Sequence, residues 1–549
     1  MGESGFTEQE EKVLKPFFTN LDKDIFVLTN LPEVVKGALF SRYSRSSKSL
    51  RRLLLEEFIN DAETGFREMV ALSEGMGDSQ VVATKKAEEF YDRVLVGYGD
   101  DSVAELGGAH IACENVSNIA SKYLEDSRIG ISPLEKSTRY VYFDKKVNGK
   151  YLYHLEQDIM ASRHTDLYIS TCDSLFDSYA KLVEPTKKWL EEKFPRENDA
   201  SDRAYSSTIR AKACDILRGF LPASTLTNVG LYGNGRSLEY LMAKMYSAGK
   251  ELKEMDFIAG QMHSELSKVI PSFVKRARGQ YGEPTIEFLA ETRKGLQALA
   301  EKVSGNDKPE AREEVTITSY DKDAEEKVAA ASLYPFTDLS FAQVKEKVKK
   351  MPRSERLKII DEALKRRKNR RHKPGRGFEH AYYEFDLLCN YAAYRDLHRH
   401  RVLTQQRQDL TVKHGFDVPV EAEAIGFEKE FNEQMGNAAE AWKKISTDVG
   451  EKQAQYVVPF AYKIRWGVSL NLRELYHLVE LRSTVQGHAD YRRVVLKMLG
   501  EVKKVQPELV KHMKFVDFRG AKEIGLERLE AEKKTDKKLE ELKKRHIGP

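Results

Sequence analysis

A motif that occurs twice along this chain is the feature that most limits how the chain folds. Pro222 is followed after twelve residues by Asn234-Gly235-Arg236, and Pro459 is followed after the same interval by Asn471-Leu472-Arg473. Each Asn-x-Arg continues as x-Leu-x-x-Leu, a spacing typical of one apolar helix face. A repeat over so long an interval predicts two copies of one domain.

The two copies also begin alike. β-branched and apolar residues at Ile25–Leu28 and Val315–Thr318 predict an opening strand in each copy. The Ala, Val, Glu and Lys residues that follow, at Val34–Leu39 and Ala324–Ala331, predict a helix after each strand. Both copies are therefore expected to start with the same order of elements.

A polar, turn-forming stretch, Ser304–Pro309, separates the two copies. The chain ends in a run of Lys and Glu, Glu532–Arg545, which predicts a solvated helix rather than a binding element. The predicted boundaries are residues 1–303 and 313–520 for the two copies, 304–312 for the linker and 521–549 for the charged helical tail.

Composition excludes several classes of protein. The 549 residues include 90 Lys and Arg against 86 Asp and Glu, a balance that gives no general reason to expect a polyanionic partner. No stretch approaches the roughly 18 consecutive apolar residues of a membrane helix, and no export signal is recognisable at the start. Metal-binding or disulfide spacing is missing from the cysteines, which are Cys113, Cys172, Cys214 and Cys389. We expect a cytoplasmic protein with buried, reduced thiols.

The first candidate site is the segment Glu135-Lys136-Ser137-Thr138-Arg139-Tyr140. If it is extended, Glu135, Ser137 and Arg139 point to one side of a strand. A carboxylate, a hydroxyl and a guanidinium together suit a uracil-like or phosphate-bearing ligand, because guanidinium binds phosphate through two bonds. An exposed polar strand is the simpler explanation of the spacing.

The second candidate site is Arg399-His400-Arg401, expected at the end of a helix. Two guanidiniums beside an imidazole concentrate hydrogen-bond donors, which suits a pyrophosphate or the electron-rich ring of a reduced flavin. A solvated basic turn explains the same residues, and the spacing does not decide between the two.

The helix that begins at the Asn-x-Arg motif offers a third set of residues. Arg482 lies eleven residues after Asn471, which is about three helical turns, so both occupy one face. The equivalent of Arg482 in the first copy is Met245, which carries no charge. An acidic segment also precedes these motifs in each copy, Ser102-Val103-Ala104-Glu105 in the first and Gly377-Phe378-Glu379-His380 in the second.

In this order the motifs resemble those of flavin-dependent thymidylate synthases, over residues 24–303 and again over 313–520. The family's signature combines Arg-His-Arg with Glu-x-Ser-x-Arg, and here the two copies divide it. The first copy keeps Glu-x-Ser-x-Arg and reads Glu125-Asp126-Ser127-Arg128 in place of Arg-His-Arg. The second copy keeps Arg-His-Arg and has Arg407, Asp409 and Thr411 in place of Glu, Ser and Arg.

Two further arginines of the family are divided in the same way. Arg218 matches the first and has Gln455 as its counterpart, whereas Arg482 matches the second and has Met245 as its counterpart. The family builds its pocket from several subunits, so complementary losses leave one composite site. The chain departs from the family at Asp396, three residues before Arg399, where Gln is usual.

The resemblance implies a helix-rich α+β fold in two tandem copies and a reaction. A methylene group passes from methylenetetrahydrofolate to C5 of dUMP, reduced FAD supplies the hydride, and NADPH restores the flavin; no Cys nucleophile is required. The residues that it assigns to the nucleotide are Glu135, Ser137, Arg139, Arg218 and Arg482. Those that it assigns to FAD are Arg399, His400, Arg401, Asn471, Arg473 and Glu379.

Partners follow from the same resemblance. The resemblance implies an assembly like the homotetramer of the family's members. Two fused copies in one chain therefore predict a homodimer of this chain, a pseudo-tetramer. The alternative is a non-catalytic nucleotide- or nucleic-acid-binding relative that uses the basic run Lys365–Lys373. No aromatic residues are interleaved in that run, which makes nucleic acid the weaker expectation.

Overall fold

The computed structural model describes residues 6–60, 104–127, 129–305, 307–310, 313–519, 525–526 and 528–546. The chain forms two compact units that do not follow the two sequence copies. Unit 1 comprises residues 1–116, 120–135 and 227–307, and unit 2 comprises residues 117–119, 136–226 and 308–549. Unit 2 therefore combines the middle of the first copy with the whole second copy. The predicted boundaries at 303 and 313 describe the sequence copies and stay a prediction.

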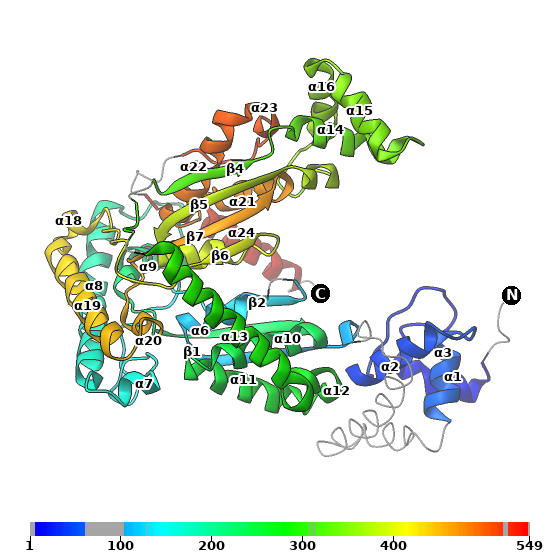
Figure 1. Cartoon of the computed structure of the whole chain (residues 1–549), viewed down its shortest axis with the longest axis horizontal. Coiled ribbons are helices and arrows are strands. Elements are labelled where there is room, and N and C mark those ends of the chain that lie inside the picture. Colours follow the sequence, from blue (N-terminus) through cyan, green and yellow to red (C-terminus); the bar gives the residue numbers. More distant parts are fainter. Residues whose placement is uncertain are drawn as a thin grey trace. The chain divides into compact units, whose positions relative to one another are not determined.

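Unit 1 contains a three-stranded sheet in the order β1-β3-β2, and Figure 1 labels its two outer strands, β1 and β2. The strands are β1 (Gly108–Ser117), β2 (Ile131–Glu135) and β3 (Leu226–Asn234), and β2 pairs antiparallel with β3. Helix α10 (Gly235–Ala248) begins directly after β3. Asn234 caps α10, because its side chain accepts a hydrogen bond from the backbone N–H of Ser237 at 2.8 Å.

Unit 2 contains a four-stranded antiparallel sheet in the order β4-β5-β7-β6 (Figure 1). Its strands are β4 (Val315–Tyr320), β5 (Tyr382–Asn390), β6 (Thr404–Arg407) and β7 (Lys463–Asn471). Helix α21 (Leu472–Arg482) follows β7, and Asn471 caps it by accepting from the backbone N–H of Glu474 at 2.9 Å. The order β5, β7, β6 repeats β1, β3, β2, and the same Asn caps the same helix. The repeat is confirmed, as is the helix-rich α+β class.

The remaining α-helices are distributed over both units. They are α1 (Glu8–Leu14), α2 (Glu33–Tyr43), α3 (Leu50–Leu53), α6 (Asn118–Glu125), α7 (Gln157–Met160), α8 (Thr165–Lys193), α9 (Asp202–Leu217), α11 (Lys253–Leu266), α12 (Pro271–Val274), α13 (Gly279–Ser304), α14 (Ala324–Leu333), α15 (Phe341–Lys350), α16 (Arg353–Leu364), α17 (Tyr391–His398), α18 (Ala422–Ile425), α19 (Glu428–Asp448), α20 (Glu451–Ala454), α22 (Ala489–Val505), α23 (Pro507–Val510) and α24 (Leu529–His546). The helices predicted at residues 34–39, 324–331 and 532–545 are confirmed as α2, α14 and α24. Among the described residues, no helix has the length and apolar character needed to cross a membrane.

The opening strand is confirmed in the second copy and is wrong in the first. β4 pairs with β5 as predicted. Across residues 25–28 the structure forms a single bridge, between Phe18 and Leu28, and the side chains of Ile25 and Val27 are 88% and 62% exposed. Apolar side chains that stay in water provide no burial energy for a strand. Residues 25–28 therefore form part of a loop and not the predicted strand.

Within unit 2, the residues around the two repeat prolines pair with each other. Segments 221–223 and 458–460 run antiparallel with a bridge between Pro222 and Pro459. Each segment donates a backbone hydrogen bond to the other, and both bonds have an N···O distance of 2.9 Å. Exchange of the same contact between equivalent residues is the geometry of a twofold interface. The two copies thus meet here about a local twofold axis, as two subunits of a homodimer do.

Helices α8 and α19 continue this contact between the copies. They lie side by side in unit 2 (Figure 1). The hydroxyl of Ser174 on α8 donates to the side chain of Gln434 on α19 at 3.0 Å, and Lys181 pairs with Glu430 at 3.0 Å. Residues of the first copy are therefore held firmly against the second.

Candidate functional site

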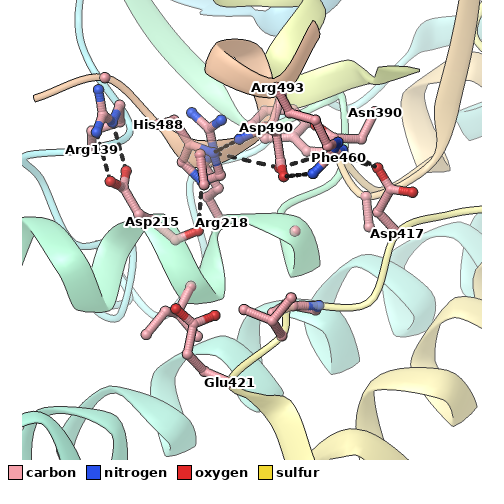
Figure 2. A pocket seen from close by; sticks show the side chains of 18 of the residues that line it. Arg139, Asp215, Arg218, Asn390, Asp417, Glu421, Phe460, His488, Asp490 and Arg493 are labelled. Atoms are coloured by element: carbon pink, nitrogen blue, oxygen red, sulfur yellow. Dashed lines mark hydrogen bonds and ion pairs between the residues drawn. The ribbon is translucent and has the colours of Figure 1, made fainter. Parts of the chain in front are cut away.

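A cavity of about 540 Å³ lies in unit 2, with walls from both sequence copies (Figure 2). The first copy contributes the end of α9 and the turn that follows it. The second copy contributes the end of β5, the loop 416–421 and the start of α22. A cavity of this size is typical of a small-ligand site.

Arg139 and Asp215 form a two-bonded ion pair in the wall of this cavity (Figure 2). Nε and Nη2 of Arg139 donate to the two carboxylate oxygens of Asp215 at 2.6 and 2.7 Å. Arg139 also donates to the backbone oxygen of Gln486 at 3.3 Å. Burial would raise the pKa of Asp215, but the charge and hydrogen bonds of Arg139 lower it to about 2. The pair therefore stays ionised at neutral pH and holds Arg139 in one orientation.

Residues 135–140 do not meet the condition of an extended segment beyond Glu135. β2 ends at Glu135, and residues 138–140 form a turn. The backbone N–H of Arg139 donates to Oγ of Ser137 at 3.2 Å, a local bond that competes with strand pairing. Arg139 is consequently buried while Ser137 is half-buried. Glu135 belongs to unit 1, where it accepts a hydrogen bond from Lys122 at 3.2 Å.

Arg218 ends α9 and is 3% exposed. Its Nη1 donates to a carboxylate oxygen of Asp396 at 3.2 Å. Nε and Nη2 of the same guanidinium are buried and have no hydrogen-bond partner within the described parts of the chain. An unsatisfied buried donor costs about 1–3 kcal/mol, and a guanidinium edge fits a phosphate. Arg218 is therefore the wall residue that most directly indicates an anionic ligand.

Asp396, on α17, is the carboxylate around which the arginines gather. Burial would raise its pKa, but the surrounding guanidinium charges hold it well below its usual range. Those guanidiniums belong to Arg399, Arg218, Arg139 and Arg482. Several guanidiniums thus share one buried carboxylate, a clustering of positive charge that suits a phosphate.

A hydrogen-bonded relay orients Arg482. Nε of Arg482 donates to Nε2 of His400 at 2.9 Å, and Nδ1 of His400 lies 2.9 Å from Oε1 of Glu474. A guanidinium only donates, so Nε2 must accept and the proton of His400 is on Nδ1, directed at Glu474. Burial lowers the pKa of His400 to about 4, so its ring is neutral at pH 7. His400 thus positions Arg482 and does not add a positive charge.

The ring of His477 joins the same relay. Donor and acceptor atoms of His400, Glu474 and His477 lie within 4.8 Å of one another, an arrangement in which metal ligands are also found. Nδ1 of His477 is 3.4 Å from Oε2 of Glu474. Since the lone pair of Nε2 on His400 is used by Arg482 and Nδ1 carries the proton, the cluster functions as a hydrogen-bonded relay.

Arg399 and Arg401 flank this relay at the end of α17, as the sequence predicts. Nη2 of Arg399 donates to Asp396 at 2.5 Å, and its side chain is 27% exposed. Arg401 is exposed. The two guanidiniums therefore border the buried His400 from the solvent side.

The other residues assigned to the flavin have structural partners. Asn471 caps α21, and Arg473 donates to the backbone oxygen of Pro374 at 2.8 Å and to Glu379 at 3.1 Å. Unit 1 has the equivalent pair, Arg236 with Glu105 at 3.1 Å. Because the pair recurs in the copy without Arg-His-Arg, it is a feature of the domain fold. Ser102, Val103 and Arg128 lie outside the described residues.

Sequence motifs do not point to Asp215, Glu474 or His488, although all three support the site. The ring of His488 joins two elements, because Nε2 donates to the backbone oxygen of Asp215 at 3.2 Å while Nδ1 accepts from the N–H of Asp490 at 3.1 Å. It therefore ties α9 of the first copy to α22 of the second (Figure 2). One available signal is the charge reversal at Lys452, the second-copy counterpart of Asp215.

The opposite wall is polar but balanced. The side-chain amide of Asn390 donates to Asp417 at 3.0 Å and to Asp490 at 2.8 Å (Figure 2). Arg493 pairs with Asp490 at 2.9 Å and with Glu314 at 2.9 Å. These groups satisfy one another and stabilise the join of β5, α22 and the loop 416–421.

None of the four cysteines is set up as a nucleophile. All are buried and free of disulfides. Burial raises the pKa of Cys113 to about 11 and those of Cys172 and Cys214 to about 12. Burial likewise raises the pKa of Cys389. These thiols remain protonated at neutral pH, and a thiol is a poor nucleophile.

The basic run 365–373 is partly used within the fold. Arg367 is buried against Glu480 at 2.5 Å and also donates to the backbone oxygen of His512 at 3.1 Å. Arg366 pairs with Glu362 at 2.6 Å. The observed pairing leaves fewer charges for nucleic acid than the sequence suggests.

Known proteins similar to this chain identify its family. The chain matches the family described as thymidylate synthase complementing protein over residues 54–272 and again over 316–508. It is 43% identical to a UPF0159 protein of Chlamydia muridarum over 532 residues, which cover 96% of this chain and 98% of that protein. It is 36% identical to a UPF0159 protein of Thermoplasma acidophilum over 507 residues, 88% of this chain and 95% of that protein. The chain belongs to the thymidylate synthase complementing protein family, as two tandem copies.

A shorter part of the chain is similar to flavin-dependent thymidylate synthases. It is 30% identical to that of Sulfurisphaera tokodaii over 150 residues, 25% of this chain and 55% of that protein. It is 31% identical to that of Pyrococcus furiosus over 140 residues, 23% of this chain and 56% of that protein. The family and these distant relatives support a thymidylate synthase-like role.

Proposed function

We propose that the chain is a FAD-dependent thymidylate synthase-like enzyme with one composite active site per chain. One observation carries the proposal. Arg139 and Arg218 of the first copy lie in the same compact unit as Asp396, Arg399 and Arg482 of the second, and their charges converge on Asp396. Each arginine is the member retained where the other copy has lost its counterpart.

The nucleotide is dUMP or a close relative. Its phosphate binds to Arg218, whose Nε and Nη2 have no hydrogen-bond partner among the described residues, and to Arg482, which His400 orients. The neighbouring turn, which contains Ser137 and Arg139, forms another part of this nucleotide site. Glu135 belongs to unit 1, and its assignment to the nucleotide stays a prediction of the family resemblance.

The residues on the second-copy side fit an anionic cofactor. Arg399 and Arg401 would hold the charged part of FAD, because both present guanidiniums beside the neutral His400. Asn471, Arg473 and Glu379 would shape the adjoining wall. Bound FAD would supply the hydride, with NADPH as reductant and methylenetetrahydrofolate as the one-carbon donor.

The protein itself contributes orientation rather than covalent catalysis. Buried thiols with raised pKa values provide no nucleophile. Fixed guanidiniums hold a nucleotide at one position and cost little reorganisation during reaction. The two copies thus bind one nucleotide from two sides.

We also propose that the protein is a cytoplasmic homodimer. The local twofold pairing at Pro222 and Pro459 resembles a subunit interface already joined within one chain. Two chains would then equal the four domains of the family's tetramer. Light scattering is expected to give twice the chain mass of 62.8 kDa, and a stable FAD-binding monomer would contradict this.

Flavin binding is the direct test of the proposed function. The purified protein should take up FAD, show flavin absorption, and titrate with one FAD and one dUMP per chain. Arg401→Ala should lose FAD, whereas Arg128→Ala, at the matching place in the first copy, should keep most of it. Two ligands of either kind per chain would mean that both composite positions work. A protein without flavin that still binds nucleotide would favour the non-catalytic alternative.

A further inference from the structure

The C-terminal helix α24 lies outside both family matches, yet it docks on the unit that holds the cavity. It packs against α9. Its first turn is buried at Leu529, so the tail is helical as predicted but is not simply solvated. The ion pairs that fasten it are Arg203 with Glu532 at 3.2 Å, Arg203 with Asp536, and Lys533 with Glu197 at 2.6 Å and Asp199 at 2.7 Å.

This docking places Arg528 at the cavity. Arg528 immediately precedes α24 and lines the cavity together with Leu526. Its guanidinium carbon lies 4.4 Å from the centre of the Tyr140 ring, and Tyr140 follows Arg139 in the chain. Arginine at a helix N-terminus is disfavoured by the helix dipole. The helix dipole therefore does not explain an arginine at this position.

Most other cations of the cavity wall are neutralised by a close carboxylate. These pairs are Arg139 with Asp215 at 2.6 Å, Lys212 with Glu421 at 3.2 Å, Lys463 with Asp417 at 3.1 Å, Lys497 with Glu314 at 3.0 Å and Arg493 with Glu314 at 2.9 Å. Arg528 differs, because its ion pair with Glu532 is 3.9 Å long. Its Nη1 is buried and has no hydrogen-bond partner in the described part of the chain, a property that it shares with two nitrogens of Arg218.

We propose that Arg528 binds a phosphate oxyanion of the ligand in this cavity, and that the docking of α24 on α9 holds it there. The side chain of Arg528 is 17% exposed, but its buried Nη1 donor gains a charge-assisted bond only when an anion enters. Resting on the proposed function, the inference gives the nucleotide phosphate a contact from a segment outside both repeats. The site is thus completed by three parts of the chain: the two copies and the C-terminal helix.

Calorimetric titration of the full chain with inorganic pyrophosphate and with dUMP tests the contact. Arg528→Gln should weaken binding of both probes by roughly 10-fold to 100-fold, as expected for loss of one charge-assisted bond. Lys534→Gln is the matched control, since it removes the same charge from an exposed position on the same helix. Equal affinities of the two variants would overturn the proposal.

A charge exchange tests the role of α24. Arg203→Asp removes the pair with Asp536 and should weaken pyrophosphate binding as Arg528→Gln does. The double variant Arg203→Asp with Asp536→Arg restores an opposite pair and should restore the affinity. Unchanged binding in Arg203→Asp, or no recovery in the double variant, would contradict the part assigned to the helix.

The two probes separate this inference from the proposed function. A wild-type protein that binds pyrophosphate but not dUMP contradicts the proposed function, while Arg528 is still tested through pyrophosphate. A wild-type protein that binds dUMP, with Arg528→Gln binding equally well, contradicts the inference alone. Binding of neither probe by the wild-type protein contradicts both.

Discussion

Two regions of unit 2 occupy equivalent places in the two sequence copies but carry opposite charges. In the first region, Arg139 follows β2 and pairs with Asp215 on α9. In the second, Asp409 follows β6 and pairs with Lys452 on α20 at 2.9 Å. At the helix, Asp215 and its counterpart Lys452 carry opposite charges, whereas in the loop Asp409 stands in the place of Ser137 and Thr411 in the place of Arg139. In these two ion pairs the loop residue is the cation only in the first region.

The two regions also differ at Arg218 and its counterpart Gln455. Arg218 directs two unsatisfied nitrogens into a buried space, within the described residues. Gln455, its counterpart, uses its side chain on the backbone, accepting from the N–H of Leu410 at 2.9 Å and donating to the oxygen of Lys452 at 3.1 Å. The first region thus keeps two buried donors unpaired, whereas the second uses its side chain to stabilise its own loop. Under the proposed function, the unpaired donors of Arg218 are the ones that contact the ligand.

The largest expected effect concerns the two ion pairs. Asp215→Ala should lower the free energy of unfolding by about 3–5 kcal/mol, because it leaves the buried Arg139 without its partner. Asp409→Ala should cost about 0–1 kcal/mol, since that pair is partly exposed, with side-chain exposures of 35% and 23%. Urea unfolding of the ligand-free variants measures both. Equal losses would remove the distinction between the regions.

A second prediction concerns nucleotide binding. Arg218→Gln installs the residue of the other region and should weaken dUMP binding by about 2–5 kcal/mol, as expected when a buried charged contact is truncated. Arg139→Ala and Arg482→Ala should fall in the same range. Calorimetric titration checks this, with Gln455→Ala and Met245→Ala as controls at the equivalent positions. Controls that lose as much as the arginine variants would contradict the idea of unequal copies.

Much of the fold could be predicted because its signals are local. The Asn caps, the helix after each sheet strand and the end of α17 at Arg399 depend on residues a few positions apart. The prediction of an opening strand at residues 25–28 failed, because the apolar side chains there lack a surface to cover them. β propensity describes a pleated, half-buried surface and fails where none forms.

The candidate site was harder to predict because its partners are far apart in the sequence. The family resemblance assigns Arg139 and Arg218 to the site, but their partners Asp215 and Asp396 depend on how the copies fold together. Alternation along a strand misplaced Ser137, since its hydroxyl bonds the chain two residues on and starts a turn. The neutral state of His400 likewise depends on burial, which a basic sequence motif does not reveal.

A third prediction uses the relay behind Arg482. The pKa of His400 is about 4 in the folded protein, below the ordinary value of 6.5, so the unfolded chain takes up a proton first as the pH falls. Stability should therefore fall from pH 6.5 to pH 4, by about 3 kcal/mol for this residue. Unfolding of wild type and His400→Gln at pH 7 and pH 4.5 measures the difference. Equal losses of unfolding free energy in wild type and in His400→Gln would contradict a neutral His400 in the folded protein. Glu474, His477 and Arg482 are the charged or titratable groups that face the ring.

The smallest expected effect concerns the hydroxyl of Ser137. Its Oγ accepts from the backbone N–H of Arg139, so Ser137→Ala should loosen the turn that presents this arginine. The loss should be about 0.5–1.5 kcal/mol, the value of one neutral hydrogen bond. It should be seen as weaker dUMP binding and slower nucleotide-dependent flavin oxidation. Asp409→Ala, at the equivalent position of the other region, should leave both quantities unchanged, because the proposed nucleotide site uses the first-copy loop. A matching loss in Asp409→Ala would mean that the second region also binds nucleotide. The different charges of the two regions would then indicate two sites for two different ligands.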